Sequence, residues 1–351
     1  MPLIPTTPKD RVILGLMTFG PEESKGARIT DISEFKRCLD RFQERGYNEV
    51  DTARVYIGRR QEAFTRDAGW KDRGLTLATK FQYPSDGDHA PEKIVESLET
   101  SLSELGTDCV DICYLHAADR ATPFAETLGA VDKLHKAGKF VRLGLSNFTA
   151  AEVAEVVMIC KYNGWVRPTI YQAMYNAITR GIEPELIPTC HRYGLEIVVY
   201  NPVAGGLFSG KIKSKDYQAE EGRFSAKNPS SANYRARYLK DSTFRALQTI
   251  ERAIEKHPGL TMIETALRWT VHHSQLRIKN GGGDGVIIGI SSYDQLDANL
   301  DSLEKGPLPE DVVQALDEAW LICKTEAPNY WHGTLAYKYD TQKALFAAGA
   351  K

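Results

Sequence analysis

The chain has 351 residues, of which 42% are hydrophobic and 26% charged, and its formal net charge at pH 7 is −2. This near-neutral balance creates no field that would attract nucleic acid or an acidic membrane surface. No apolar run reaches the roughly 18 residues of a transmembrane helix, and the first residues lack the apolar region of a signal peptide. Six scattered cysteines without a CxxC motif predict reduced thiols and a cytoplasmic protein.

Short apolar segments rich in β-branched residues alternate with segments of helical periodicity along most of the chain. The predicted strands are Val12–Phe19, Asn48–Thr52, Leu75–Phe81, Val110–His116, Val141–Ser146, Thr169–Met174, Glu196–Tyr200 and Val286–Ile290. The predicted helices are Asp31–Arg45, Pro91–Leu105, Phe124–Lys136, Thr149–Lys161, Glu183–Tyr193, Ser242–Lys256, Thr261–His273 and Tyr293–Leu303.

Alternating strands and helices indicate parallel pairing, because parallel neighbours need a crossover connection. Eight such units in a chain of this length predict an α/β protein, a closed (β/α)8 TIM barrel that forms a single domain over residues 1–351. The alternative is an open doubly wound sheet, but the sequence contains no GxGxxG motif after the first strand or elsewhere.

Two segments interrupt the alternation. Residues 201–238 are rich in Gly, Ser, Lys and Arg, and we expect them to form a long loop after strand 7 that covers the active face as a lid. After Gly306 the sequence predicts one more helix, Pro309–Lys324, and then a tail with several aromatic residues and a short amphipathic end.

Four polar residues stand at the ends of three successive predicted strands. Asp51 opens the run DTARVY, which ends at Tyr56, while Lys80 closes LTLATK and His116 closes VDICYLH. Singly, each has an ordinary structural interpretation as a helix cap, a packing residue or a solvated rim residue. Together, at strand ends where barrels build their sites, they predict a tyrosine proton donor with a lysine held by an aspartate. We expect the ammonium to ease proton loss from the phenol.

Several motifs resemble the aldo-keto reductase family, from about Val12 to Trp331. They are DTARVY, ATK, YLHAAD, GLSNF, YQAMYN, YNPVAGGLFSGK and IGISSYDQLDANL. HHSQL, GRF, YRARY and PNYW are similar to the branch of aflatoxin aldehyde and succinic semialdehyde reductases. The resemblance implies NADPH-dependent reduction of aldehydes to alcohols, with ketones as a second substrate class, and no metal.

The resemblance also assigns roles to residues of this sequence. It implies that Tyr56 is the general acid, that Lys80 and Asp51 tune it, and that His116 orients the substrate. The residues it implies for cofactor binding are Ser146, Asn147, Gln172, Tyr200, Asn201, Leu207, Gly210, Lys211, Gly289, Ser291, Ser292, Gln295 and Asn299. Hydroxyls and amides at a helix N-terminus suit a phosphate, which favours NADPH over NADH.

The substrate end departs from the family pattern, because His332 stands where the branch usually has arginine after PNY and an aromatic residue. Histidine cannot make the bidentate contact of arginine with a carboxylate, so a preference for carboxylate-bearing aldehydes does not follow from this position. Arg223, Arg235 and Arg237 in the lid are alternative sources of a cation. We expect a small carbonyl substrate near Arg223, Arg235, Tyr330 and His332, with a homodimer as a family-level expectation.

Two alternatives come from other functional classes. Some barrels of this family are cofactor-sensing accessory subunits of membrane complexes, with tight NADPH binding and slow turnover, and the four polar residues are compatible with that function. A barrel isomerase or lyase would leave Ser146, Asn147, Gln172 and Tyr200 unexplained as a set.

Overall fold

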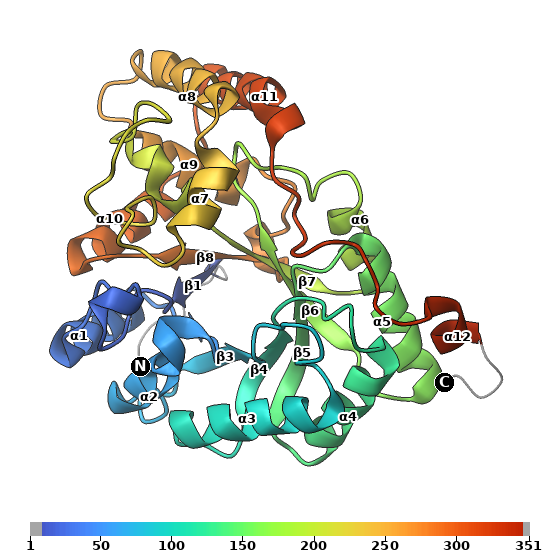
Figure 1. Cartoon of the computed structure of the whole chain (residues 1–351). Coiled ribbons are helices and arrows are strands. Elements are labelled where there is room, and N and C mark those ends of the chain that lie inside the picture. The colour runs from blue at the N-terminus through green and yellow to red at the C-terminus, as the bar shows by residue number, and fades with distance from the viewer. Residues whose placement is uncertain (1–8, 347–351) are drawn as a thin grey trace.

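The computed structural model describes residues 9–346, in which eight parallel strands close into a barrel in chain order, with β8 paired to β1 (Figure 1). The strands are β1 Arg11–Gly15, β2 Glu49–Asp51, β3 Thr76–Lys80, β4 Val110–Leu115, β5 Phe140–Ser146, β6 Pro168–Met174, β7 Glu196–Tyr200 and β8 Gly285–Gly289. The predicted (β/α)8 barrel is therefore confirmed.

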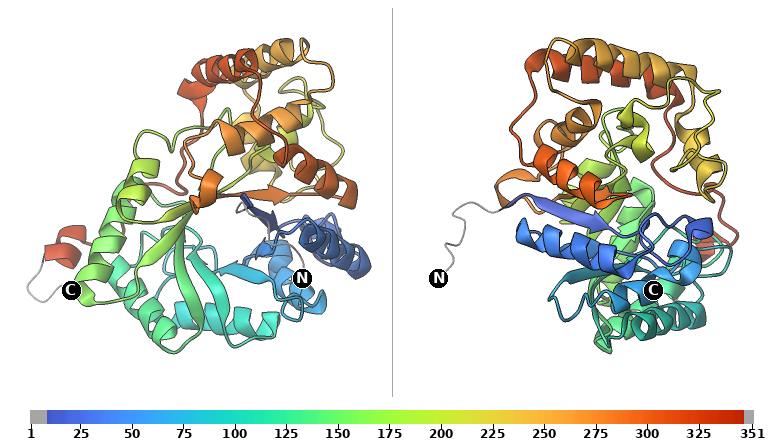
Figure 2. Two further views of the ribbon diagram at one scale, coloured as in Figure 1. Left: turned by 180° about the vertical axis from the view of Figure 1, so that it is seen from behind. Right: turned by 90° about the vertical axis from the view of Figure 1, so that its left-hand side faces the viewer.

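Helices surround the barrel on its outer side, as the back and side views of Figure 2 show. They are α1 Ile32–Glu44, α2 Gln61–Asp67, α3 Pro91–Leu105, α4 Phe124–Lys136, α5 Ala150–Asn163, α6 Leu186–Arg192, α9 Met262–His272 and α10 Tyr293–Leu303. Local sequence explains several starts: Asp31 caps α1, Pro91 opens α3, and Thr149 forms a capping box with Glu152 at α5.

The hydrophobic core has two layers, which explains why the strands carry apolar side chains on both faces. A small cluster fills the barrel interior and contains Ile13, Ala78, Ile112, Tyr114, Ile170, Val198 and Ile287. A larger cluster lies between the strands and the surrounding helices. Gly144 is needed on β5 because a Cβ atom there would collide with the ring of Tyr114 on β4.

Two predicted elements start or end several residues away from their predicted bounds, and one helix lies outside the predicted set. Strand β1 ends at Gly15 and not at Phe19, because the chain turns after Leu16 and Phe19 forms a bridge with Ile29. Helix α6 begins at Leu186 and not at Glu183. No predicted helix corresponds to α2 (Gln61–Asp67), which follows the 3₁₀ turn Tyr56–Arg59.

The segment 201–238 is the predicted long connection after β7, but it is not a loop throughout. It contains a 3₁₀ turn, η3 (Ala204–Ser209), and a helix, α7 (Ser231–Tyr238). The ring of Phe224 packs against those of Tyr234 and Tyr238, with centroids 6.0 and 6.4 Å apart. This small aromatic cluster gives α7 a buried side, which its polar sequence does not predict.

Two helices lie side by side outside the ring around the barrel, α8 (Asp241–Ile254) and α11 (Glu310–Cys323) (Figure 1). The tail after α11 then crosses to the opposite side of the molecule, where α12 (Thr341–Phe346) lies next to α5 (Figure 1). The predicted C-terminal helix and tail are thus confirmed. No helix within residues 9–346 is both long and apolar enough to span a membrane.

Candidate active site

Asp51, Tyr56 and Lys80 meet at the C-terminal ends of β2 and β3. The Lys80 ammonium is completely buried and lies 2.6 Å from Asp51 Oδ2, 2.7 Å from the Thr52 carbonyl oxygen and 3.2 Å from the Tyr56 hydroxyl. These three oxygens match the three N–H groups of the ammonium. The predicted lysine, aspartate and tyrosine are therefore brought into contact, although their catalytic roles stay predictions.

Burial and the neighbouring charges set the protonation of this cluster. Burial acts against the charge on Lys80, but Asp51 and Tyr56 outweigh it and raise the pKa of Lys80 above its ordinary value. Burial also raises the pKa of Tyr56, and Lys80 opposes this shift without cancelling it. The ammonium thus eases proton loss in the expected direction, but burial has the larger effect, and Tyr56 keeps its proton at neutral pH, as a proton donor must.

The backbone directly after Tyr56 is strained. Ile57, Gly58 and Arg59 have φ angles of 48°, 60° and 72°, in the left-handed region that β-branched residues avoid. Such a residue costs on the order of 1–2 kcal/mol there. The Ile57 side chain packs against Gly20, where a Cβ atom would lie 2.9 Å from it, so tertiary packing holds the turn that presents Tyr56.

His116 follows β4 and packs against two tyrosines. Its ring centroid is 6.0 Å from that of Tyr56 and 5.1 Å from that of Tyr83. Burial, and then the charge of Lys80, lower the pKa of His116 well below its usual value, so the imidazole is neutral at pH 7. Its buried Nδ1 atom has no hydrogen-bond partner among residues 9–346.

Four of the residues that the resemblance implies for cofactor binding form one hydrogen-bonded network beside this cluster. The Ser146 hydroxyl donates to the Gln172 carbonyl (3.0 Å), and the Asn147 amide nitrogen donates to Ser146 Oγ (3.0 Å) and to the His116 carbonyl (2.9 Å). The Tyr200 hydroxyl donates to Asn147 Oδ1 at 2.8 Å. Gln172 Nε2 donates to Asp51 Oδ1 at 2.8 Å, which joins the network to the lysine cluster.

The other predicted cofactor residues follow β7 and β8, at the same end of the barrel. After β7, Asn201 donates to the Tyr238 hydroxyl at 2.6 Å, and Leu207 is buried in η3, which ends at Gly210 with exposed Lys211 beyond it. After β8, Gly289 has no atom within 4 Å of its Cβ position. Beyond Gly289, the Ser291 amide donates to the Gln295 side chain, and Ser292 caps α10. Asn299 is buried in the same helix.

These residues fit a nicotinamide dinucleotide. The amide and hydroxyl groups of this network can replace their hydrogen bonds to one another with hydrogen bonds to a carboxamide, which needs both donors and acceptors. The free space at Gly289, the open Cβ position of Gly206 and the exposed ammonium of Lys211 suit a phosphate-bearing chain.

The four expected substrate residues separate into two pairs. Arg223 lies close enough to lower the pKa of Tyr56, and within residues 9–346 it has no acidic partner. His332 lies beside Tyr83, with its Nδ1 atom 3.0 Å from the Tyr83 hydroxyl. Arg235 instead donates to two carbonyl groups of its own segment, and the Tyr330 hydroxyl binds the Ala150 amide and Glu185.

Sequence reasoning missed Tyr83, although it stands three residues after Lys80 at the same strand end. It also missed Arg120, which pairs with Glu152 at 2.7 Å and donates to the His332 carbonyl at 2.7 Å. Nothing in the sequence connects Arg120 to a residue more than two hundred positions later.

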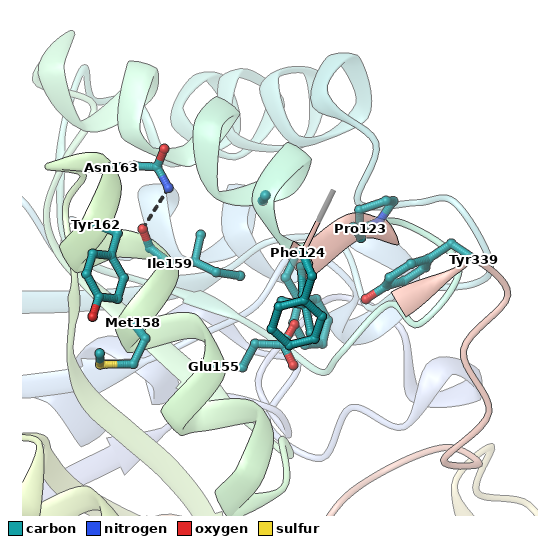
Figure 3. Close-up of a pocket in the computed structure, with 12 residues that line it drawn as sticks. Pro123, Phe124, Glu155, Met158, Ile159, Tyr162, Asn163 and Tyr339 are labelled. Atoms are coloured by element: carbon teal, nitrogen blue, oxygen red, sulfur yellow. Dashed lines mark hydrogen bonds between the residues drawn. The ribbon is translucent and has the colours of Figure 1, made fainter. Parts of the chain in front are cut away.

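A hollow of about 400 Å³ lies elsewhere, between α4, α5 and α12 (Figure 3). Phe124, Met158, Ile159, Tyr162 and Tyr339 line much of it. None of the four predicted catalytic residues contributes to its wall, so this hollow is separate from the candidate active site.

Comparison with known proteins gives a consistent result. The model of the aldo/keto reductase family matches residues 11–321. Aflatoxin B1 aldehyde reductase member 2 of Rattus norvegicus is 43% identical over 329 residues, which cover 91% of this chain and 87% of that protein. Human aldo-keto reductase family 7 member A3 is 43% identical over 328 residues, covering 91% and 96%. Aldo-keto reductase pigE of Monascus ruber is 36% identical over 342 residues, covering 93% and 99%.

Proposed function

Because this chain belongs to the aldo/keto reductase family, and is thus an oxidoreductase acting on carbonyl or alcohol groups, we propose that it reduces aldehydes to alcohols with NADPH and that Tyr56 supplies the proton. The observation that carries the proposal is the hydrogen-bonded series Asp51, Lys80 and Tyr56, beside an imidazole with a free buried nitrogen.

Each of these side chains has one task. Tyr56 donates its proton to the carbonyl oxygen as negative charge develops there, and the Lys80 ammonium, 3.2 Å away, stabilises the phenolate that remains. Asp51 and the Thr52 carbonyl hold Lys80 in its charged form and in position. Neutral His116 orients the substrate oxygen toward Tyr56.

A bound nicotinamide supplies the hydride. Ser146, Asn147 and Gln172 would hold its carboxamide, and the ring of Tyr200 would lie against it. Asn201, Leu207, Gly210 and Lys211 would border the pyrophosphate. Residues from Gly289 to Asn299, which include Ser291, Ser292 and Gln295, would bind the adenosine end, where a helix N-terminus favours the additional phosphate of NADPH.

The substrate itself would be a small carbonyl compound near Arg223 and His332. Arg235 and Tyr330 are left out of the proposed pocket, because their polar atoms already bind elsewhere. Orientation of the two reactants can lower the activation free energy by about 7–11 kcal/mol. Holding the reactants in that orientation is the main task of the residues around Tyr56.

Steady-state turnover of 4-nitrobenzaldehyde, followed by NADPH absorbance, tests the proposal. We expect saturable oxidation of NADPH that depends on the aldehyde, and a lower kcat/KM with NADH. Absence of turnover with every small aldehyde tested would contradict the proposal. Tight NADPH binding combined with negligible turnover would instead favour the accessory-subunit alternative.

A further inference from the structure

His332 lies between Tyr83 and Arg237, although no two of the three are neighbours in the sequence. Its Nδ1 atom is 3.0 Å from the Tyr83 hydroxyl, and its Nε2 atom is 3.0 Å from an Arg237 guanidinium nitrogen. The main chain of His332 is fixed as well, since its amide donates to the Asn147 carbonyl at 3.1 Å and its carbonyl accepts from Arg120 at 2.7 Å. The ring therefore has one defined position.

The Arg237 contact determines which nitrogen of His332 carries the proton. A guanidinium has donors only, so Nε2 must accept, and a neutral imidazole then has its single proton on Nδ1. Burial, followed by the charges of Arg237 and Arg120, lowers the pKa of His332 to about 4, and the neutral form prevails at pH 7. Nδ1 thus donates to the Tyr83 oxygen.

This assignment leaves the proton of Tyr83 available. Because the Tyr83 oxygen accepts from His332, its own O–H group must point elsewhere, and among residues 9–346 the hydroxyl has no second partner. Burial raises the pKa of Tyr83, so the hydroxyl keeps its proton at neutral pH. The ring of Tyr83 is partly buried and meets His116 edge-on, and His116 meets Tyr56 in the same way.

We propose that Tyr83 determines substrate specificity by donating a hydrogen bond to a second oxygen of the aldehyde, with His332 and Arg237 as positioning residues. The preferred substrates are aldehydes with a neutral carbonyl or hydroxyl oxygen close to the reacting group. A hydroxyl offers one donor and not the paired donors that suit a carboxylate. The inference rests on the proposed reductase function, since it concerns the same pocket.

Two aldehydes and the variant Tyr83→Phe test this role. Phenylglyoxal has a second carbonyl oxygen next to its aldehyde, whereas benzaldehyde has none. In Tyr83→Phe, kcat/KM for phenylglyoxal should fall about tenfold, as the loss of one hydrogen bond implies, mainly through a higher KM. The value for benzaldehyde should stay within about twofold. Hydration of phenylglyoxal cancels in the ratio between the two proteins.

Two variants at position 332 test the positioning role. The amide of His332→Gln can accept from Arg237 and donate to Tyr83, so this variant should keep most of the preference for phenylglyoxal. His332→Leu can do neither and should lose the preference as Tyr83→Phe does. A purely structural role of His332 would not separate selectivity in this way.

The outcomes distinguish the two proposals. If wild-type protein reduces both aldehydes and Tyr83→Phe changes both equally or neither, the specificity role is wrong while the reductase function stands. If His332→Gln and His332→Leu behave alike, the positioning role is wrong. Wild-type protein that reduces neither aldehyde overturns both proposals.

Discussion

Tyr200 makes a hydrogen bond that a bound cofactor would replace. Its hydroxyl donates to Asn147 Oδ1, which is the acceptor that a nicotinamide carboxamide would need. Without cofactor, this bond gives the buried Asn147 amide oxygen a hydrogen-bond partner. In the proposed complex, the same tyrosine would therefore have two opposing effects on NADPH affinity, since its ring would support the nicotinamide while its hydroxyl would compete for Asn147 Oδ1.

The variants Tyr200→Phe and Tyr200→Ala separate these two effects. Tyr200→Phe frees Asn147 Oδ1 and keeps the ring, so the Kd for NADPH should decrease roughly two- to tenfold, the equivalent of one hydrogen bond. Tyr200→Ala removes the ring as well and should increase the Kd. Fluorescence titration with NADPH measures both, and equal weakening in the two variants would contradict the proposed competition.

His332 should make stability depend on pH. Its pKa is lowered from 6.5 to about 4 in the folded protein, so the unfolded chain binds more protons between these values. Stability from this residue is thus fully present above pH 6.5 and decreases as the pH falls toward 4. The groups around the ring are Tyr83, Arg237, Arg120 and His116, and the two guanidinium groups oppose its protonation.

Denaturant unfolding of wild type and His332→Gln at several pH values measures this effect. Between pH 6.5 and a pH below 4, the free energy of unfolding of the wild type should decrease by up to roughly 3 kcal/mol more than that of the variant. This value follows from the pKa shift of His332. Parallel stability curves for the two proteins would show that His332 is not held in its neutral form.

At the scale of elements, the C-terminal tail connects the molecular surface to the candidate active site. The Tyr337 hydroxyl donates to Glu152 at 2.9 Å, and the Lys338 amide donates to the Arg120 carbonyl at 2.8 Å. Glu152 and Arg120 form the buried ion pair that also holds the His332 carbonyl. The tail beyond His332 therefore stabilises the residue that orients Tyr83.

A chain that ends at Ala336 tests this connection. Removal of residues 337–351 takes away two anchors of Arg120 and Glu152 but no residue of the barrel, so the protein should fold and bind NADPH as before. The KM for phenylglyoxal should rise several-fold, because Arg120 and Glu152, which hold the His332 carbonyl, would lose two hydrogen bonds to the tail. An unchanged KM, with the same NADPH affinity, would show that the tail does not act on the pocket.

The barrel was predictable because its physical signal is local. Strands such as Val110–Leu115 are short and mostly apolar, and Asp51, Lys80 and His116 stand at or just after the ends of three of them. Asp51, Tyr56, Lys80 and His116 could be placed together because successive parallel strands bring their C-terminal ends to one edge.

The features that the sequence did not predict depend on contacts between distant residues or on the balance between burial and charge. Helix α7 has a polar sequence, and only its packing with Phe224 gives it a buried side. The relation of His332 to Tyr83 spans 249 positions. The protonation of Tyr56 required the balance between burial and the Lys80 charge, and the residues alone indicate only the second effect.

On the scale of the whole molecule, the barrel makes the proposed chemistry possible by gathering polar groups from the ends of six neighbouring strands, β2 to β7, near one phenol. The most direct test is a single-turnover experiment in which Tyr56→Phe with bound NADPH is mixed with 4-nitrobenzaldehyde. Oxidation of NADPH should be slower by about a hundredfold to ten-thousandfold, the usual contribution of a positioned proton donor. The Kd for NADPH should be unchanged. Oxidation at the wild-type rate would contradict the assignment of Tyr56 as the proton donor.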